Sequence, residues 1–300
     1  NKDSFNPYMA AIQKVLQLNV AFVRGEGTRL FDAEGRIYLD FVAGFGSVPF
    51  GHSPPALNQA LMAFAQTSEP TMVQVSAMPA AQTLANKLLS FMPSELDTVW
   101  LCNSGTEAVE AAIKAARAVS GCYRIISARN GFHGKTLGAL AATHRRKYQE
   151  PFLTSEAVDE AFIQVDFGDI ACLSRTLEQH AGKVAAILLE PVQGEGGAVV
   201  PPAGYLRAVR DLCDQHRVLL ILDEIQTGFW RTGPRFAAEA EQVVPDIMVL
   251  AKALGGGLVP IGACVMKRSV YSEEFGMKHS STFGGNGLCA RIACAALEEF

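Results

Sequence analysis

From about residue 80 onward, short apolar segments alternate with segments whose apolar residues recur at helical spacing. The apolar segments predict strands at 98–102, 124–127, 185–189, 218–222, 247–251 and 262–266. Amphipathic helices are predicted between them, among others at 106–120, 170–180 and 204–216. Strands joined by crossover helices favour a mostly parallel sheet covered by helices. The pattern therefore predicts an α/β fold, preceded by a β-hairpin where residues 28–41 alternate around a turn at 32–35.

Composition narrows the class of protein. The 300 residues are 49% hydrophobic and 19% charged, as expected of a globular chain with a large core. A net charge of −4 without a long basic run argues against nucleic acid as a partner. The apolar runs are too short to cross a bilayer, so no membrane partner is expected. Seven cysteines without a Cys-x-x-Cys pair argue against a metal site and favour a reducing, cytoplasmic location.

The first predicted strand is followed by small and hydroxyl residues at a helix start. In sheets of this kind, ligands bind beyond the carboxyl ends of the strands. Ser104, Gly105 and Thr106 stand there, where unpaired N–H groups and the helix dipole favour a phosphate. An ordinary helix cap is the alternative, and it is the better interpretation of this segment alone.

The loop after the second predicted strand is similar to a nucleotide-binding P-loop. Gly134, Lys135 and Thr136 match the end of that pattern, but Arg129 stands where its first glycine should be. A nucleotide-binding protein is therefore a distant alternative. Phe132, in the same loop, is a candidate for stacking on a ligand, with loop packing as the other interpretation.

Acidic residues follow the next two strands, and a lysine follows the strand after them. Glu190 and Asp223 come directly after apolar runs, where a carboxylate needs a partner, either an arginine or a cationic ring nitrogen. Lys252 is surrounded by small apolar residues, which lower an amine's pKa and favour Schiff-base formation. Phosphate site, aromatic residue, acid and lysine together match the chemical parts of pyridoxal phosphate.

These segments carry motifs that resemble the class III aminotransferases, of ornithine and ω-amino acid type, among the fold-type I pyridoxal-phosphate enzymes. The putrescine aminotransferase branch looks particularly similar. The motifs are NSGTE at 103–107, GFHGKT at 131–136, EPVQGEGG at 190–197, DEIQTG at 223–228, RTG at 231–233, AKALGGG at 251–257 and STFGG at 281–285.

The resemblance implies roles around the cofactor ring. Lys252 would form the Schiff base with pyridoxal phosphate and shuttle the substrate proton. Asp223 would pair with the ring nitrogen, Phe132 would stack on the ring, and Gln226 would contact the ring hydroxyl. Glu195 would help to switch between amino donor and acceptor in a ping-pong transfer.

The resemblance also implies how the phosphate is bound. Ser104, Gly105 and Thr106 would contact it, and Thr282 would reach the phosphate of a neighbouring subunit, so that a homodimer is expected. The expected cofactor-binding set is completed by two further motif residues, His133 and Glu190.

The domain organisation follows from the same resemblance. We expect an N-terminal segment with the hairpin at 1–45, a large cofactor-binding domain at 46–285, and at 286–300 a helix leading to a small domain that this chain lacks.

The substrate is less defined. Lys135 stands where ornithine enzymes carry a carboxylate-binding arginine, and lysine lacks that planar fork. Aromatic residues at Phe45, Phe50, Phe229 and Trp230 favour an apolar or amine-type substrate, unless they are core residues. An aminomutase of glutamate-semialdehyde type, which uses the same cofactor, is the nearer alternative, because fold does not fix reaction type.

Overall fold

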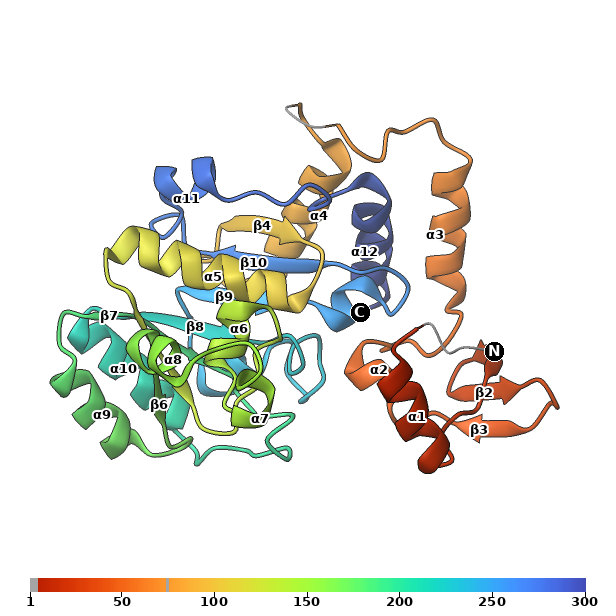
Figure 1. Ribbon diagram of the computed structural model, residues 1–300. Coiled ribbons are helices and arrows are strands. Elements are labelled where there is room, and N and C mark those ends of the chain that lie inside the picture. Colours follow the sequence, from red (N-terminus) through yellow and green to blue (C-terminus); the bar gives the residue numbers. More distant parts are fainter. Residues whose placement is uncertain (1–4, 74–75) are drawn as a thin grey trace.

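A seven-stranded mixed sheet lies at the centre of the chain in the computed structural model, which describes residues 5–73 and 76–300 (Figure 1). The strands, in their order across the sheet, are β4 (Thr98–Cys102), β10 (Gly262–Met266), β9 (Ile247–Leu250), β8 (Leu219–Asp223), β7 (Val184–Leu189), β5 (Arg124–Ala128) and β6 (Phe162–Val165). From β9 to β6 all neighbours are parallel, whereas β10 runs antiparallel to both β9 and β4.

The predicted α/β fold and its mostly parallel sheet are confirmed. All six predicted strands are present, with ends that differ by at most one residue from the prediction. Edge strand β6 was not predicted: it is four residues long, includes the polar Gln164 and follows helix α8 (Ser155–Ala161) without a turn.

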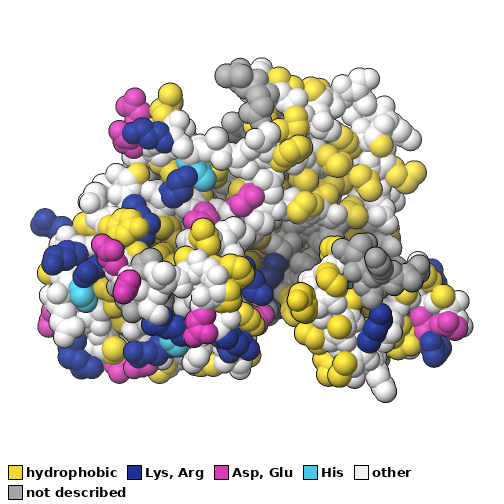
Figure 2. Space-filling view, in the orientation of Figure 1, with side chains coloured by type: hydrophobic (Ala, Val, Ile, Leu, Met, Phe, Trp, Pro, Cys, Tyr) yellow, Lys and Arg dark blue, Asp and Glu magenta, His cyan; other side chains and the backbone are white. Residues whose placement is uncertain are grey.

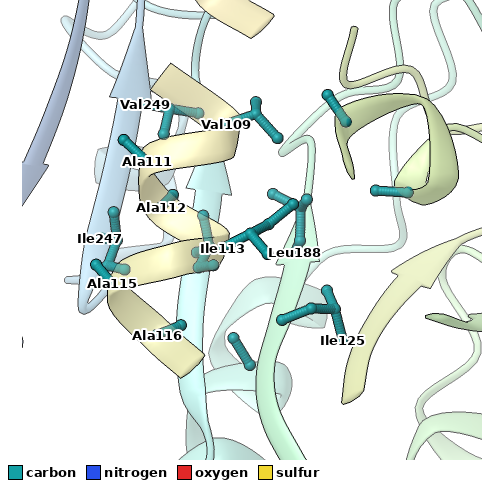
Figure 3. Packing of buried hydrophobic residues seen from close by; sticks show 14 of the residues in the cluster. Val109, Ala111, Ala112, Ile113, Ala115, Ala116, Ile125, Leu188, Ile247 and Val249 are labelled. Atoms are coloured by element: carbon teal, nitrogen blue, oxygen red, sulfur yellow. The ribbon is translucent and has the colours of Figure 1, made fainter. Parts of the chain in front are cut away.

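Helices cover both faces of the sheet. On one face, α5 (Gly105–Ser120) packs its alanine-rich side on the central strands, where Ile113 lies beside Leu188 and Ala115 beside Ile247 (Figure 3). Its small side chains let the helix axis approach the sheet closely. The other face is covered by α9 (Ile170–Gln179) and α10 (Tyr205–His216).

The remaining elements are shorter or lie at the ends of the chain. Helix α12 (Gly287–Glu299) packs on α3 (Pro55–Ala65) and α4 (Pro79–Leu89). The others are α2 (Ala43–Gly46), α6 (Leu137–Ala142), α7 (Arg146–Gln149), α11 (Glu273–Lys278) and the 3-10 helices η1 (Ala237–Glu241) and η2 (Lys252–Gly255).

A small antiparallel sheet precedes the large one and lies to one side of it (Figure 1). The predicted hairpin is present as β2 (Arg29–Asp32) and β3 (Ile37–Leu39); β1 (Phe22–Glu26) extends it and was not predicted. Helix α1 (Pro7–Val15) buries none of its side chains. The expected division of the chain at 46 and 286 stays a prediction.

The described residues include neither a membrane-spanning helix nor a metal-binding cluster. No helix among them combines the length and the apolar character needed to cross a membrane. Nor do the described residues include three or more His, Cys, Asp or Glu side chains grouped so that they could hold a metal ion.

Candidate active site

A cavity of about 550 Å³ opens where β8 and β9 end and α5 begins. This is the sheet edge at which parallel strands present their carboxyl ends. Nine of the eleven predicted site residues line it: Ser104, Gly105, Thr106, Phe132, His133, Glu190, Asp223, Gln226 and Lys252. Thr282 and Glu195 are not among its lining residues.

Lys252 follows β9 after a single residue and begins η2. Its φ of 45° is a left-handed conformation that residues other than glycine rarely adopt, and such strained positions are frequent at functional sites. Burial lowers the pKa of its amine; the charges of Asp223, Glu190 and Glu195 oppose this, and that of Arg231 adds to it. The net lowering favours the neutral, nucleophilic amine.

Asp223 ends β8 with a buried carboxylate that is fixed on two sides. Its Oδ2 lies 2.7 Å from Nδ1 of His133, and its Oδ1 accepts a 3.1 Å hydrogen bond from the Ile225 N–H. Burial lowers the pKa of His133, but the hydrogen bond and the charge of Asp223, with the charge of Glu190, outweigh it and raise that pKa. A carboxylate held in this way at a cavity wall suits a cationic ring nitrogen.

Glu190 holds the loop that carries Phe132. Its two oxygens accept hydrogen bonds from the N–H groups of Phe132, at 2.9 Å, and Gly194, at 3.0 Å. Burial raises the pKa of the Glu190 carboxyl. Gly194 in turn packs against Gln226, where an added Cβ would lie 2.0 Å from the Gln226 Oε1. Glu190 therefore positions both the aromatic residue and the segment behind Gln226.

The start of α5 forms another wall of the cavity. Ser104 is its N-cap and accepts a 3.3 Å hydrogen bond from the Glu107 N–H, so the helix-cap interpretation is correct for this side chain. The cap does not exclude a phosphate site, because several N–H groups at a helix start have no intrahelical partner. At Gly105 an added Cβ would lie 2.8 Å from the Ile225 Cδ1, so the turn has no space for a side chain.

Two predicted site residues, Glu195 and Thr282, and also Lys135, do not line the cavity. Glu195 is exposed, and its backbone carbonyl accepts a 2.8 Å hydrogen bond from Nη2 of Arg145. Thr282 is exposed, in a turn before α12. The Lys135 amine lies 4.6 Å from the centre of the Tyr148 ring and does not line the cavity.

The aromatic residues that suggested an apolar substrate pocket do not line this cavity either. Phe229 and Trp230 stack on Phe300, and Phe50 packs against the same ring. Core packing is the correct interpretation for the buried Phe229, whereas Phe50 is partly buried and Trp230 is 40% exposed. Phe45 is exposed. The apolar wall that the sequence analysis missed comes from residues 258–261. Their only signal in the sequence is their position directly after the glycine triplet at 255–257.

Comparison with known proteins agrees with this geometry. A profile of the family Aminotransferase class-III matches residues 10–300. The aminotransferase PigE of Serratia sp. is 42% identical over 300 residues, which cover 98% of this chain and 35% of that protein. The acetylornithine aminotransferase of Methanopyrus kandleri is 43% identical over 282 residues, or 93% of this chain and 69% of that protein.

The fold is also similar to that of solved aminotransferase structures. The ornithine aminotransferase of Toxoplasma gondii, crystallised with partial occupancy of pyridoxal phosphate at its active site, superimposes with a TM-score of 0.85. It is 32% identical in sequence, and the match covers 99% of this chain and 71% of that one. The chain thus spans about a third of the length of one relative and about two thirds of the length of the other.

Proposed function

Because the chain belongs to the class-III aminotransferase family, whose members depend on pyridoxal phosphate, we propose that it transfers amino groups from an amine or ω-amino acid to an aldehyde, ketone or 2-oxo acid. The observation that carries the proposal is that Lys252, Asp223 and the start of α5 line one cavity. These three features match the aldehyde, the ring nitrogen and the phosphate of the cofactor. When bound, pyridoxal phosphate supplies a carbonyl carbon for amines and a ring that takes up an electron pair.

Each side chain named here would have its own role toward the cofactor or the substrate. When pyridoxal phosphate is bound, the neutral Nζ of Lys252 would hold it and would be placed to move a proton to and from the substrate carbon. Asp223, held by His133 and the Ile225 N–H, would keep the proton on the ring nitrogen. Phe132 would stack on the ring, and Gln226 would contact its hydroxyl group. Donor and acceptor use the same cavity in turn, which predicts ping-pong kinetics.

For the donor, we propose an amine that carries no carboxylate, such as an alkyl amine or a diamine, rather than an ω-amino acid. The described lining of the cavity includes no arginine and only one lysine, Lys252, which would be joined to the cofactor when it is bound. Lys135, at the position of the carboxylate-binding arginine, is directed at Tyr148 instead. The small wall at 258–261 is apolar.

We further propose that the protein acts as a homodimer. Thr282 does not line the cavity of its own chain, and it is exposed in a turn. Both observations agree with a role for this residue in a neighbouring active site, where its hydroxyl would contact the phosphate.

An absorbance titration tests the proposed function. The protein is freed of cofactor and titrated with pyridoxal phosphate, and amines are then added one at a time without an acceptor. We expect a visible band that forms with the cofactor and bleaches with the donor. Putrescine and alkyl amines are compared with ornithine and acetylornithine, the substrates in the names of the relatives. A preference for acetylornithine or ornithine would contradict the donor assignment, and failure to form a band would contradict the function itself.

A further inference from the structure

The segment that is similar to a P-loop has a different set of contacts in this fold. Thr136 places its Oγ1 2.8 Å from the Thr106 Oγ1 and 2.6 Å from the Glu110 Oε1. The backbone N–H of Thr136 also donates to the Thr106 Oγ1, at 3.2 Å. Thr106 and Glu110 are four residues apart and therefore lie on the same side of α5. Thr136 bridges them from the opposite loop.

Glu110 fixes this loop at a second point. Its Oε1 accepts hydrogen bonds from the N–H groups of Gly138, at 2.8 Å, and Ala139, at 3.1 Å, in the first turn of α6. The N-cap residue of α6 is Thr136, whose side chain makes no capping hydrogen bond, so Glu110 caps α6 from α5.

Two glycines leave the space that these contacts need. A Cβ at Gly134 would lie 2.2 Å from the Thr106 Oγ1, and a Cβ at Gly138 would lie 2.3 Å from the Glu110 Oε2. Gly134 also has a φ of 129°, which side chains with a Cβ rarely adopt. The glycine spacing of this loop therefore serves its packing against α5.

The donors and acceptors fix the direction of these hydrogen bonds. As a carboxylate, Glu110 only accepts, so the Thr136 hydroxyl donates to it. The oxygen of Thr136 then accepts from the Thr106 hydroxyl. With its proton directed at Thr136, Thr106 is held in one orientation at the cavity wall, and the backbone N–H groups at the start of α5 remain for an anion.

We propose that Glu110 and Thr136 are positioning residues for the phosphate of the cofactor. They hold Thr106 and the turn at the start of α5 without lining the cavity themselves. The inference rests on the proposed function, because it concerns the same cofactor. It assigns to Thr136 a role that the P-loop pattern does not predict.

The test compares pyridoxal phosphate with pyridoxal, which lacks the phosphate. Dissociation constants of both are measured by titration of the cofactor-free protein for wild type, Thr136→Val and Thr136→Ser. Thr176→Val is the control, because the Thr176 hydroxyl also donates to a protein oxygen, the Cys172 carbonyl, in a helix remote from the cavity. Thermal unfolding of each cofactor-free variant is recorded as well.

We expect Thr136→Val to raise the dissociation constant of pyridoxal phosphate roughly tenfold, which corresponds to the loss of about one hydrogen bond. The dissociation constant of pyridoxal should stay unchanged. Thr136→Ser should restore the wild-type constants, and the control should alter neither. If Thr136→Val leaves both constants unchanged, or weakens both in the same proportion, the positioning role is wrong. If the wild type binds neither compound, the proposed function fails, and this role with it.

Discussion

The large sheet and the small amino-terminal sheet hold their strands together in different ways. In the large sheet every residue of β7, β9 and β10 is buried, and the contacts join segments far apart in the sequence. In the small sheet most side chains of the three strands are exposed, and Figure 2 shows hydrophobic side chains on the surface of the amino-terminal part that contains this sheet and α1. Its turn is held by Asp32, which accepts hydrogen bonds from the Glu34 N–H, the Arg36 N–H and side chain, and the Tyr38 hydroxyl.

The two sheets therefore differ in their relation to the candidate active site. Non-local burial makes the large sheet a rigid frame whose strand ends carry Lys252 and Asp223. The small sheet depends on short-range polar contacts and contributes no residue to the described lining of the cavity. Substitutions should therefore have large effects on chemistry and stability in the first region and small effects in the second.

The largest effect is expected for Lys252→Ala. Loss of the amine removes both the attachment point and the proton carrier, so turnover should fall by about 10²- to 10⁴-fold. Steady-state rates with an accepted amine give the measurement, and Lys183→Ala, an exposed lysine, gives the control. Equal rates in Lys252→Ala and wild type would show that the chemistry does not depend on this strand end.

A pair of leucine substitutions compares the two sheets directly. Leu188→Ala, in β7, removes a fully buried side chain and should lower the free energy of unfolding by about 2–5 kcal/mol. Leu39→Ala, in β3, removes a side chain that is 62% exposed and should change it by less than about 1 kcal/mol. Chemical denaturation measures both. Similar losses for the two variants would contradict the comparison.

The smallest effect concerns the pH dependence of stability. Burial raises the pKa of Glu224 to about 7, although hydrogen bonds from Thr227 and the N–H groups of Ala237 and Ala238 lower it. Between the ordinary glutamate pKa and about 7, the folded protein keeps a proton that the unfolded chain has released. Stability from this group is therefore complete at low pH and is lost as the pH rises through about 7, by a few kcal/mol at most.

Glu224→Gln should remove this loss. The free energy of unfolding of the variant, minus that of the wild type, should therefore increase from pH 5 to pH 8, by at most roughly 3 kcal/mol. Glu34→Gln, at an exposed residue of the small sheet, serves as the control. A difference that stays constant with pH would contradict the assignment to Glu224.

The sequence by itself determined six of the seven strands of the large sheet and most of the residues that line the cavity. Apolar runs bounded by polar residues specify buried strands, and in parallel sheets the residues after them converge on one edge. That is why Ser104, Asp223 and Lys252 could be placed together before any coordinates were known. The short edge strand β6 was not predicted, because a run of four residues that includes the polar Gln164 gives no periodic signal.

Only the tertiary structure decided which way individual side chains face and which residues they contact. Asp223 and Glu224 are adjacent in sequence, yet one lines the cavity and the other holds the start of η1, because successive residues at a strand end face opposite sides. Phe229 belongs to the core, Trp230 stacks on Phe300 outside the cavity, and Lys135 is directed at Tyr148. The contacts of Thr136 with Thr106 and Glu110 join a loop to helix α5, and such long-range pairing leaves no local pattern in a sequence.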